Sequence, residues 1–145
     1  MTRHPRFPFF ISGCVVLILM AIAHCIATVK GFPPPTGDDQ TTLMRLMTTL
    51  KEEQTQRTML ELYTGFNWFF TLAPIVMAVA GFSLLSIGRR EPSAIRRVAL
   101  VYTFGCAAFL SSSLVYWFIA PTSFLALATL LFLIAAVRDG RTRAA

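Results

Sequence analysis

The sequence predicts an all-α integral membrane protein: a four-helix bundle with an extra amphipathic helix in the first periplasmic loop. Three observations lead to this fold class. Hydrophobic residues make up 55% of the 145 residues and charged residues only 14%, whereas soluble domains carry about 25% charged residues. The apolar residues form four runs that are each long enough to cross about 30 Å of hydrocarbon. The basic residues gather in short clusters beside these runs, as orientation signals do.

The same composition argues against several other classes of protein. A net charge of +6 would suggest a polyanionic partner in a soluble chain, but the position of the basic clusters beside apolar runs makes a nucleic-acid partner unexpected. All three cysteines lie inside apolar runs without CxxC or CxxH spacing, so we expect small buried side chains, no disulfide and no metal site. No phosphate-binding glycine loop or nucleotide motif is present, and no cofactor is predicted.

The whole chain, 1–145, is predicted to form a single membrane domain with spans at about 9–29, 62–87, 94–119 and 121–137. Basic residues precede the first span, and its Ala21-Ile22-Ala23 also resembles a signal-peptide cleavage site. We expect this segment to be retained as a span.

The segment 30–61 is predicted to be a periplasmic loop that carries the extra helix. Three consecutive prolines, Pro33 to Pro35, exclude a helix just after the first span. Asp38, Asp39 or Thr41 is then expected to cap a new helix.

Between residues 41 and 50, apolar side chains recur at three- and four-residue spacing, which predicts one apolar stripe. This helix is expected to pack over the mouth of the bundle or to lie in the headgroup plane, and the alternative is a helix that docks a partner protein. The polar segment 51–57 is predicted to continue the helix, because no glycine or proline intervenes before Tyr63.

The three later spans carry their own local signals. Pro74 is expected to bend the second span, and Gly65 and Gly81 to permit close helix contacts. A polar turn at 88–97 leads to the third span, where Ser111 to Ser113 are expected to bond to the preceding helical turn. Pro121 suits the first turn of the fourth span, whose small residues suggest packing against a second copy of the chain.

Orientation follows from the distribution of Arg and Lys. The N-terminus, the second loop and the C-terminal tail hold two, four and three basic residues, the long first loop holds four, and the third loop holds none. The positive-inside rule therefore places both termini and the turn at 88–97 in the cytoplasm. Trp68, Trp117, Tyr63 and Tyr116 then fall at the outer interface, where such rings are favoured.

With this topology, polar side chains of all four spans fall in one outer layer, where membrane bundles often build a ligand site. The candidate ligand-binding residues are His24, Thr28, Glu61, Tyr63, Asn67, Ser112 and Tyr116. The inner half of the spans is aliphatic and aromatic.

Two of these candidates have a functional and a structural interpretation. His24 suits a general base, a proton carrier or a metal ligand, or it is a neutral histidine bonded to a neighbour. Glu61 either ionises opposite His24 or pairs with Arg57 one turn earlier. Asn67 is expected to bond to a neighbouring helix in preference to a ligand.

The sequence Glu61-Leu62-Tyr63-Thr64-Gly65-Phe66, with His24 and Thr28 in the first span and Phe32-Pro33-Pro34 in the loop, resembles a family of small bacterial four-helix membrane proteins. The resemblance covers the first two spans and the loop between them. It implies the four-helix architecture and points to His24, Glu61, Tyr63 and Gly65, but it supplies no activity.

These observations predict a multi-pass protein of the bacterial inner membrane that binds a lipid or another lipophilic ligand in an outer-leaflet pocket. Membrane lipids are the expected partners, together with a second copy of the chain or a partner membrane protein. The alternatives are a small membrane enzyme with His24 and Glu61 as an acid–base pair, a proton-coupled exporter and an accessory subunit. Chemistry by the chain itself is the less expected of these functions, because no nucleophile motif is present.

Overall fold

The computed structural model describes residues 6–116 and 119–139, except for the side chain of Tyr116. Within these ranges the chain is all-helical, without strands. The helices are α1 (Pro8–Lys30), α2 (Asp38–Thr49), α3 (Met59–Gly88), α4 (Pro92–Tyr116) and α5 (Ile119–Arg138). All but α2 are long and apolar enough to cross a membrane. The predicted all-α fold with four long apolar helices is thereby confirmed.

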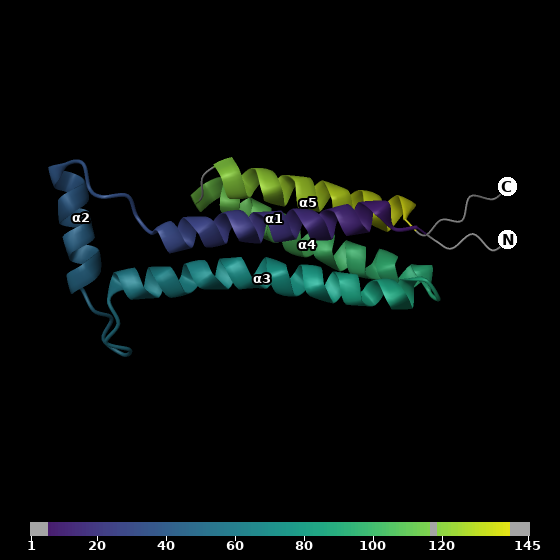
Figure 1. Ribbon diagram of the computed structural model, residues 1–145, viewed down its shortest axis with the longest axis horizontal. Helices are drawn as coiled ribbons and strands as arrows, with labels where there is room; N and C mark the ends of the chain where they lie inside the picture. Colours follow the sequence, from purple (N-terminus) through teal and green to yellow (C-terminus); the bar gives the residue numbers. More distant parts are fainter. Residues whose placement is uncertain (1–5, 117–118, 140–145) are drawn as a thin grey trace.

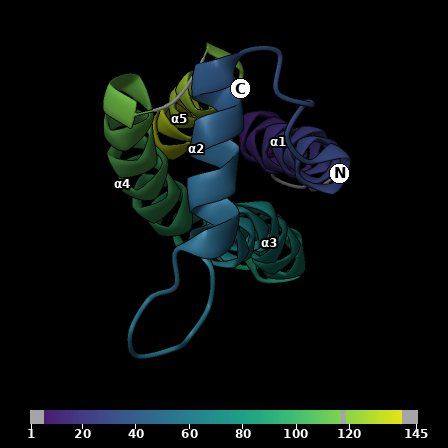
Figure 2. The same ribbon diagram turned by 90° about the vertical axis from the view of Figure 1, so that its left-hand side faces the viewer.

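The four long helices run side by side, and α2 lies across one end of them at a steep angle (Figures 1 and 2). Helix α1 packs against α3 and α5, α4 packs against α5 and, less extensively, against α3, and α2 contacts α3. Helix α1 begins and α5 ends at the end of the bundle that is opposite α2. Helix α3 continues through Pro74 without a break.

The core lies where α1 crosses the other long helices. Phe10 and Phe132 are completely buried, with their ring centroids 5.7 Å apart. Gly13 and Gly81 allow this close approach, because a Cβ atom on either would lie within 3 Å of Phe132 or Cys14. The predicted role of Gly65 in helix contact is wrong for the described residues, since none of them lies within 4 Å of a Cβ atom built at that position.

Large apolar side chains on the outside of the long helices are widely exposed, such as Phe104 and Val76. A soluble protein rarely exposes apolar surface on this scale. Such a surface is suited to lipid contact, because hydrocarbon solvates these side chains as well as a protein core does.

The segment 51–57 is not helical, and the predicted continuation of α2 into the second span is wrong. Leu50 leaves the helix with an extended backbone, and Lys51 and Thr58 form an isolated antiparallel bridge. The carboxylate of Glu52 organises the turn between them, because it accepts hydrogen bonds from the backbone amides of Gln54 and Thr55. These bonds favour the ionised carboxylate and hold the pKa of Glu52 below its ordinary value.

The start of α2 also differs from the expected capping. Gly37 is the N-cap residue and carries no side chain that could cap. Asp38 and Asp39 lie in the first turn, where negative charge favours the helix dipole, and the Thr41 hydroxyl donates to the carbonyl of Gly37. The helix therefore starts at Asp38, earlier than any of the three predicted caps would place it, and it has no side-chain cap.

At the end of the bundle opposite α2, two long-range hydrogen bonds join the helix ends. The buried carboxylate of Asp139 accepts from the backbone amide of Phe10 at 2.8 Å, one of the amides that the first turn of α1 leaves without a helical partner. The guanidinium of Arg96 donates to the carbonyl of Ala136 near the end of α5. The capping of α1 by Asp139 was not predicted, because it joins residues that are far apart in the sequence.

Candidate ligand cavity

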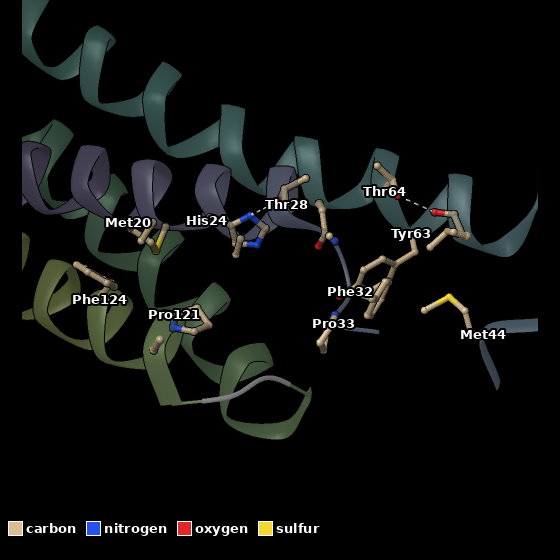
Figure 3. A pocket seen from close by; sticks show the side chains of 16 residues that line it. Met20, His24, Thr28, Phe32, Pro33, Met44, Tyr63, Thr64, Pro121 and Phe124 are labelled. Atoms are coloured by element: carbon tan, nitrogen blue, oxygen red, sulfur yellow. Dashed lines mark hydrogen bonds between the residues drawn. The ribbon is translucent and has the colours of Figure 1, made fainter. Parts of the chain in front are cut away.

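A cavity of about 740 Å³ lies at the α2 end of the bundle, between α1, α3 and the start of α5 (Figure 3). Part of the segment that follows α1 and one residue of α2 complete its wall. The described lining residues are Met20, Ala23, His24, Ala27, Thr28, Gly31, Phe32, Pro33, Met44, Leu60, Tyr63, Thr64, Asn67, Ala120, Pro121 and Phe124. Its volume is in the range of small-molecule sites.

His24 is held between two threonine hydroxyls. Its Nδ1 lies 3.2 Å from Thr71 Oγ1 of α3 and 3.3 Å from Thr28 Oγ1, one turn later on α1. Thr71 is buried and also donates to the carbonyl of Asn67. The imidazole therefore joins α1 to α3 at the wall of the cavity, which is the structural role that the sequence left open beside a functional one.

The part of the cavity next to α2 is aromatic. The rings of Phe32 and Tyr63 lie with their centroids 5.2 Å apart, and Figure 3 shows them between His24 and Met44. Met20, Pro121 and Phe124 lie at the opposite side of the cavity. The cavity thus has an aromatic end, a polar middle and an apolar end.

A second, small chamber of about 30 Å³ lies deeper in the bundle. It shares Met20, His24 and Pro121 with the large cavity and is otherwise lined by apolar side chains and Cys106. Its volume is about that of one water molecule. Because the two spaces share these walls, His24 lies at the boundary between the outer cavity and the core.

The predicted site residues do not all meet at the cavity. His24, Thr28, Tyr63 and Asn67 line it, whereas Glu61 and Ser112 are absent from the described lining. The side chain of Tyr116 lies outside the described part of the chain. Binding of a ligand by the four residues that line the cavity stays a prediction.

Glu61 faces its own helix end. Its carboxylate accepts from the backbone amide of Thr58 at 2.8 Å, the Thr58 hydroxyl accepts from the amide of Glu61, and Arg57 lies 3.4 Å away. This arrangement is a capping box. The pairing with Arg57 that the sequence offered as the structural interpretation is confirmed, and the carboxylate is exposed.

The serines of α4 show two different roles. Ser111 donates to the carbonyl of Ala107, as the sequence predicts. Ser113, however, is buried and forms a 2.6 Å hydrogen bond with Thr122 of α5. The predicted bonding of Ser113 to its own helix is therefore wrong, because the tightly packed α4 and α5 bring a hydroxyl from α5 within its reach.

Most of the apolar wall was not predicted from sequence, and neither was Thr71, which bonds to His24 from α3. Thr71 follows Asn67 by four positions, so helical periodicity places both on one face of α3 and could have indicated it. No comparable signal marks Met44, Pro121 or Phe124. The sequence pattern of an apolar residue is the same whether its side chain faces lipid, the core or a cavity.

The described residues provide few ligands for a metal ion. Among the described residues, no group of three or more His, Cys, Asp or Glu side chains is close enough to hold one. His24 is bonded to threonine hydroxyls, and the cavity wall contains no carboxylate among its described residues. The described wall provides hydrogen-bonding groups, apolar surface and one imidazole, that of His24.

The capping box yields a first testable expectation. Thr58→Ala should lower the free energy of unfolding by about 0.5–2 kcal/mol, because the amide of Glu61 loses its acceptor. Glu61→Ala should also lower it, because the amide of Thr58 loses its acceptor. Ligand occupancy of the purified protein should not change, since neither side chain lines the cavity. Thermal unfolding and native mass spectrometry would measure both quantities, and loss of ligand from Glu61→Ala at unchanged stability would contradict this separation.

In comparisons with known proteins, no family model, curated protein or solved structure matches this chain. The resemblance carried by Glu61 to Phe66 therefore stays a prediction.

Proposed function

We propose that this protein is an inner-membrane protein that binds a lipid or another lipophilic ligand in the outer cavity. The observation that carries the proposal is the cavity of about 740 Å³, whose walls are mostly apolar and whose polar side chains gather around His24. Ligand sites typically combine a predominantly apolar wall with a few polar groups that fix orientation. A cavity at the end of a membrane bundle is also accessible to lipids.

The proposed orientation has both termini in the cytoplasm and α2 on the periplasmic side. It rests on the arginines of the turn at 88–97, which lie at the end of the bundle where α1 begins and α5 ends. Positive charge is enriched on the cytoplasmic side of membrane proteins. The cavity then opens in the outer leaflet.

Helix α2 is proposed to act as an interfacial cover for this cavity. It crosses the end of the bundle (Figure 1), its Met44 contributes to the cavity wall, and Leu43, Leu46 and Leu50 are exposed. Exposed leucines on a helix that lies across the bundle axis suit burial among lipid headgroups.

The acid–base alternative finds less support in the geometry. It requires His24 and Glu61 to reach one ligand atom. Glu61 is occupied by Thr58 and Arg57 and lies outside the described cavity wall. Binding without chemistry is therefore the function that the site supports best.

A cavity-filling variant tests the proposed function. Ala27 lines the cavity, and Ala27→Trp should lower the amount of co-purified lipid about tenfold, equivalent to about 1.4 kcal/mol of binding free energy. Native mass spectrometry of protein extracted in a mild detergent would measure the occupancy.

The matched control is Ala80→Trp, since Ala80 is exposed on α3 and does not line either cavity. Equal lipid occupancy in wild type, Ala27→Trp and Ala80→Trp would remove the proposed function.

A further inference from the structure

The described cavity wall contains no Asp, Glu, Lys or Arg side chain. The charged residues next to lining residues in sequence do not join the described wall: Glu61 pairs with Arg57. Lys30 adjoins Gly31 and Arg45 adjoins Met44, but neither Lys30 nor Arg45 is among the lining residues. A charged group that leaves water costs several kcal/mol unless an opposite charge receives it. The described wall offers no permanently charged partner for a phosphate or an ammonium group, and the imidazole of His24 is already bonded to Thr28 and Thr71.

The polar side chains of the wall suit a neutral oxygen. The side-chain amide of Asn67 has no hydrogen-bond partner among the described residues. This amide can both donate and accept a hydrogen bond. The Thr28 hydroxyl lies on the facing helix α1 and is positioned by His24 at 3.3 Å. Two other threonine hydroxyls nearby bond to their own helix, because Thr64 donates to the carbonyl of Leu60 and Thr71 to that of Asn67.

An amide inside a membrane protein gains from a hydrogen-bond partner, because hydrocarbon provides none. A carbonyl or hydroxyl oxygen placed between Asn67 and Thr28 would supply one, while the remaining ligand surface meets Met20, Phe124 and the aromatic pair Phe32 and Tyr63. Flat or aliphatic groups both fit such a surface.

From this arrangement we infer that the ligand is an uncharged lipophile whose carbonyl or hydroxyl oxygen bonds to Asn67 and Thr28, an inference that rests on the proposed function. Two sources share this chemistry: a quinone ring, which presents carbonyls, and a diacylglycerol, which presents a hydroxyl and ester carbonyls. Phospholipids, whose headgroups carry charge, are excluded from the polar middle of the cavity.

The test uses the delipidated full-length protein in a mild detergent. The probes are a decyl-substituted benzoquinone, dioctanoylglycerol, phosphatidylglycerol and phosphatidylethanolamine, and binding is followed by native mass spectrometry and thermal shift. We expect stoichiometric binding of at least one uncharged probe, with the dissociation constant at least about tenfold lower than for either phospholipid. Preference for the quinone or for the diacylglycerol identifies the source.

Asn67→Leu and Thr28→Val should each weaken binding of the uncharged probe about tenfold, which is the loss of one hydrogen bond in an apolar site. Thr129→Val is the matched control, because the Thr129 hydroxyl bonds only to the backbone of α5 in the described structure and lies outside the cavity. Two variants on different helices keep the test valid if one of them fails to fold.

The outcomes separate this inference from the proposed function. Phospholipid binding that Ala27→Trp abolishes would overturn the uncharged class and leave the cavity as a lipid site. Uncharged probes that bind equally well to Asn67→Leu and Thr28→Val would overturn the polar anchor. Binding of no probe to wild type would count against both.

Discussion

Gly13→Ala is expected to lower the free energy of unfolding by about 1–3 kcal/mol, the cost of overpacking a filled core. A Cβ atom at Gly13 would lie 2.7 Å from the ring of Phe132. That ring is completely buried and packs against Phe10 and Tyr102, so it has no free space into which to move. Thermal unfolding in a mild detergent, together with detergent titration, would measure the loss.

The matched substitution Gly65→Ala should have the opposite sign. In the described part of the chain no atom lies within 4 Å of a Cβ atom at this position of α3, so the added methyl meets no obstacle there. Alanine in a helix interior is favoured over glycine by about 0.5–1 kcal/mol. If both variants shifted the unfolding transition in the same direction, the packing of α1 against α5 described above would be incorrect.

Asp139→Leu is expected to destabilise the protein by about 1–3 kcal/mol. The substitution leaves the backbone amide of Phe10 buried without its acceptor, and an unsatisfied buried donor carries a cost of this size. Asp139→Asn should lose less, because its side-chain carbonyl can still accept. Glu53→Leu, at an exposed position of the loop before α3, is the control and should change stability by less than about 0.5 kcal/mol.

The same carboxylate predicts a pH dependence. Burial raises the pKa of Asp139 above its ordinary value of 3.8, although the hydrogen bonds from the amides of Phe10 and Phe9 oppose this shift. The folded state therefore binds the proton more tightly than the unfolded state, so the group contributes most stability below pH 3.8 and loses it as the pH rises through the folded-state pKa. Asp139→Asn should lack this part of the pH profile.

A comparison of melting temperatures between about pH 3 and pH 7 would isolate the effect, because all other titrating groups are common to wild type and Asp139→Asn. Parallel profiles for the two proteins would show that Asp139 does not titrate differently in the folded state. An Asp139→Leu variant that melts like wild type would refute the capping of α1 by the end of α5.

The four long helices were predictable because each depends only on local composition. The run from Phe9 to Val29 corresponds to α1, Pro8–Lys30, and the predicted span 121–137 to α5, Ile119–Arg138. Apolar residues over that length have few alternatives in a membrane, where the backbone must satisfy its own hydrogen bonds.

Local reasoning failed where a short-range hydrogen bond competes with helix propensity. The segment 51–57 contains no glycine or proline, yet the carboxylate of Glu52 gathers the amides of Gln54 and Thr55 and closes a turn. Thr58 can then cap α3 only because the preceding chain is not helical. Good helix formers do not exclude such a turn when their side chains satisfy the backbone instead.

Only some of the residues that line the cavity could be predicted from the sequence. His24 and Thr28 are one helical turn apart, so their shared face followed from periodicity, and Asn67 was placed at the same depth of the membrane. Glu61 was placed there as well, but rotation about the axis of α3 and the bonds to Thr58 and Arg57 direct its carboxylate away from the cavity. The depth of a residue along a predicted span follows from its position in the sequence. The direction in which its side chain points depends on how the helices pack.

The sequence by itself determined the number of long helices, their approximate limits and the charge asymmetry of the chain, because these follow from composition and spacing along one helix. Only the tertiary structure decided that Thr71 holds His24, that Asp139 caps α1 and that Phe132 fills the space above Gly13. Each of these contacts joins residues at least 47 positions apart. The physical reason is that hydrocarbon accepts any apolar face of a helix equally well, so the rotation of each helix is set by its neighbours.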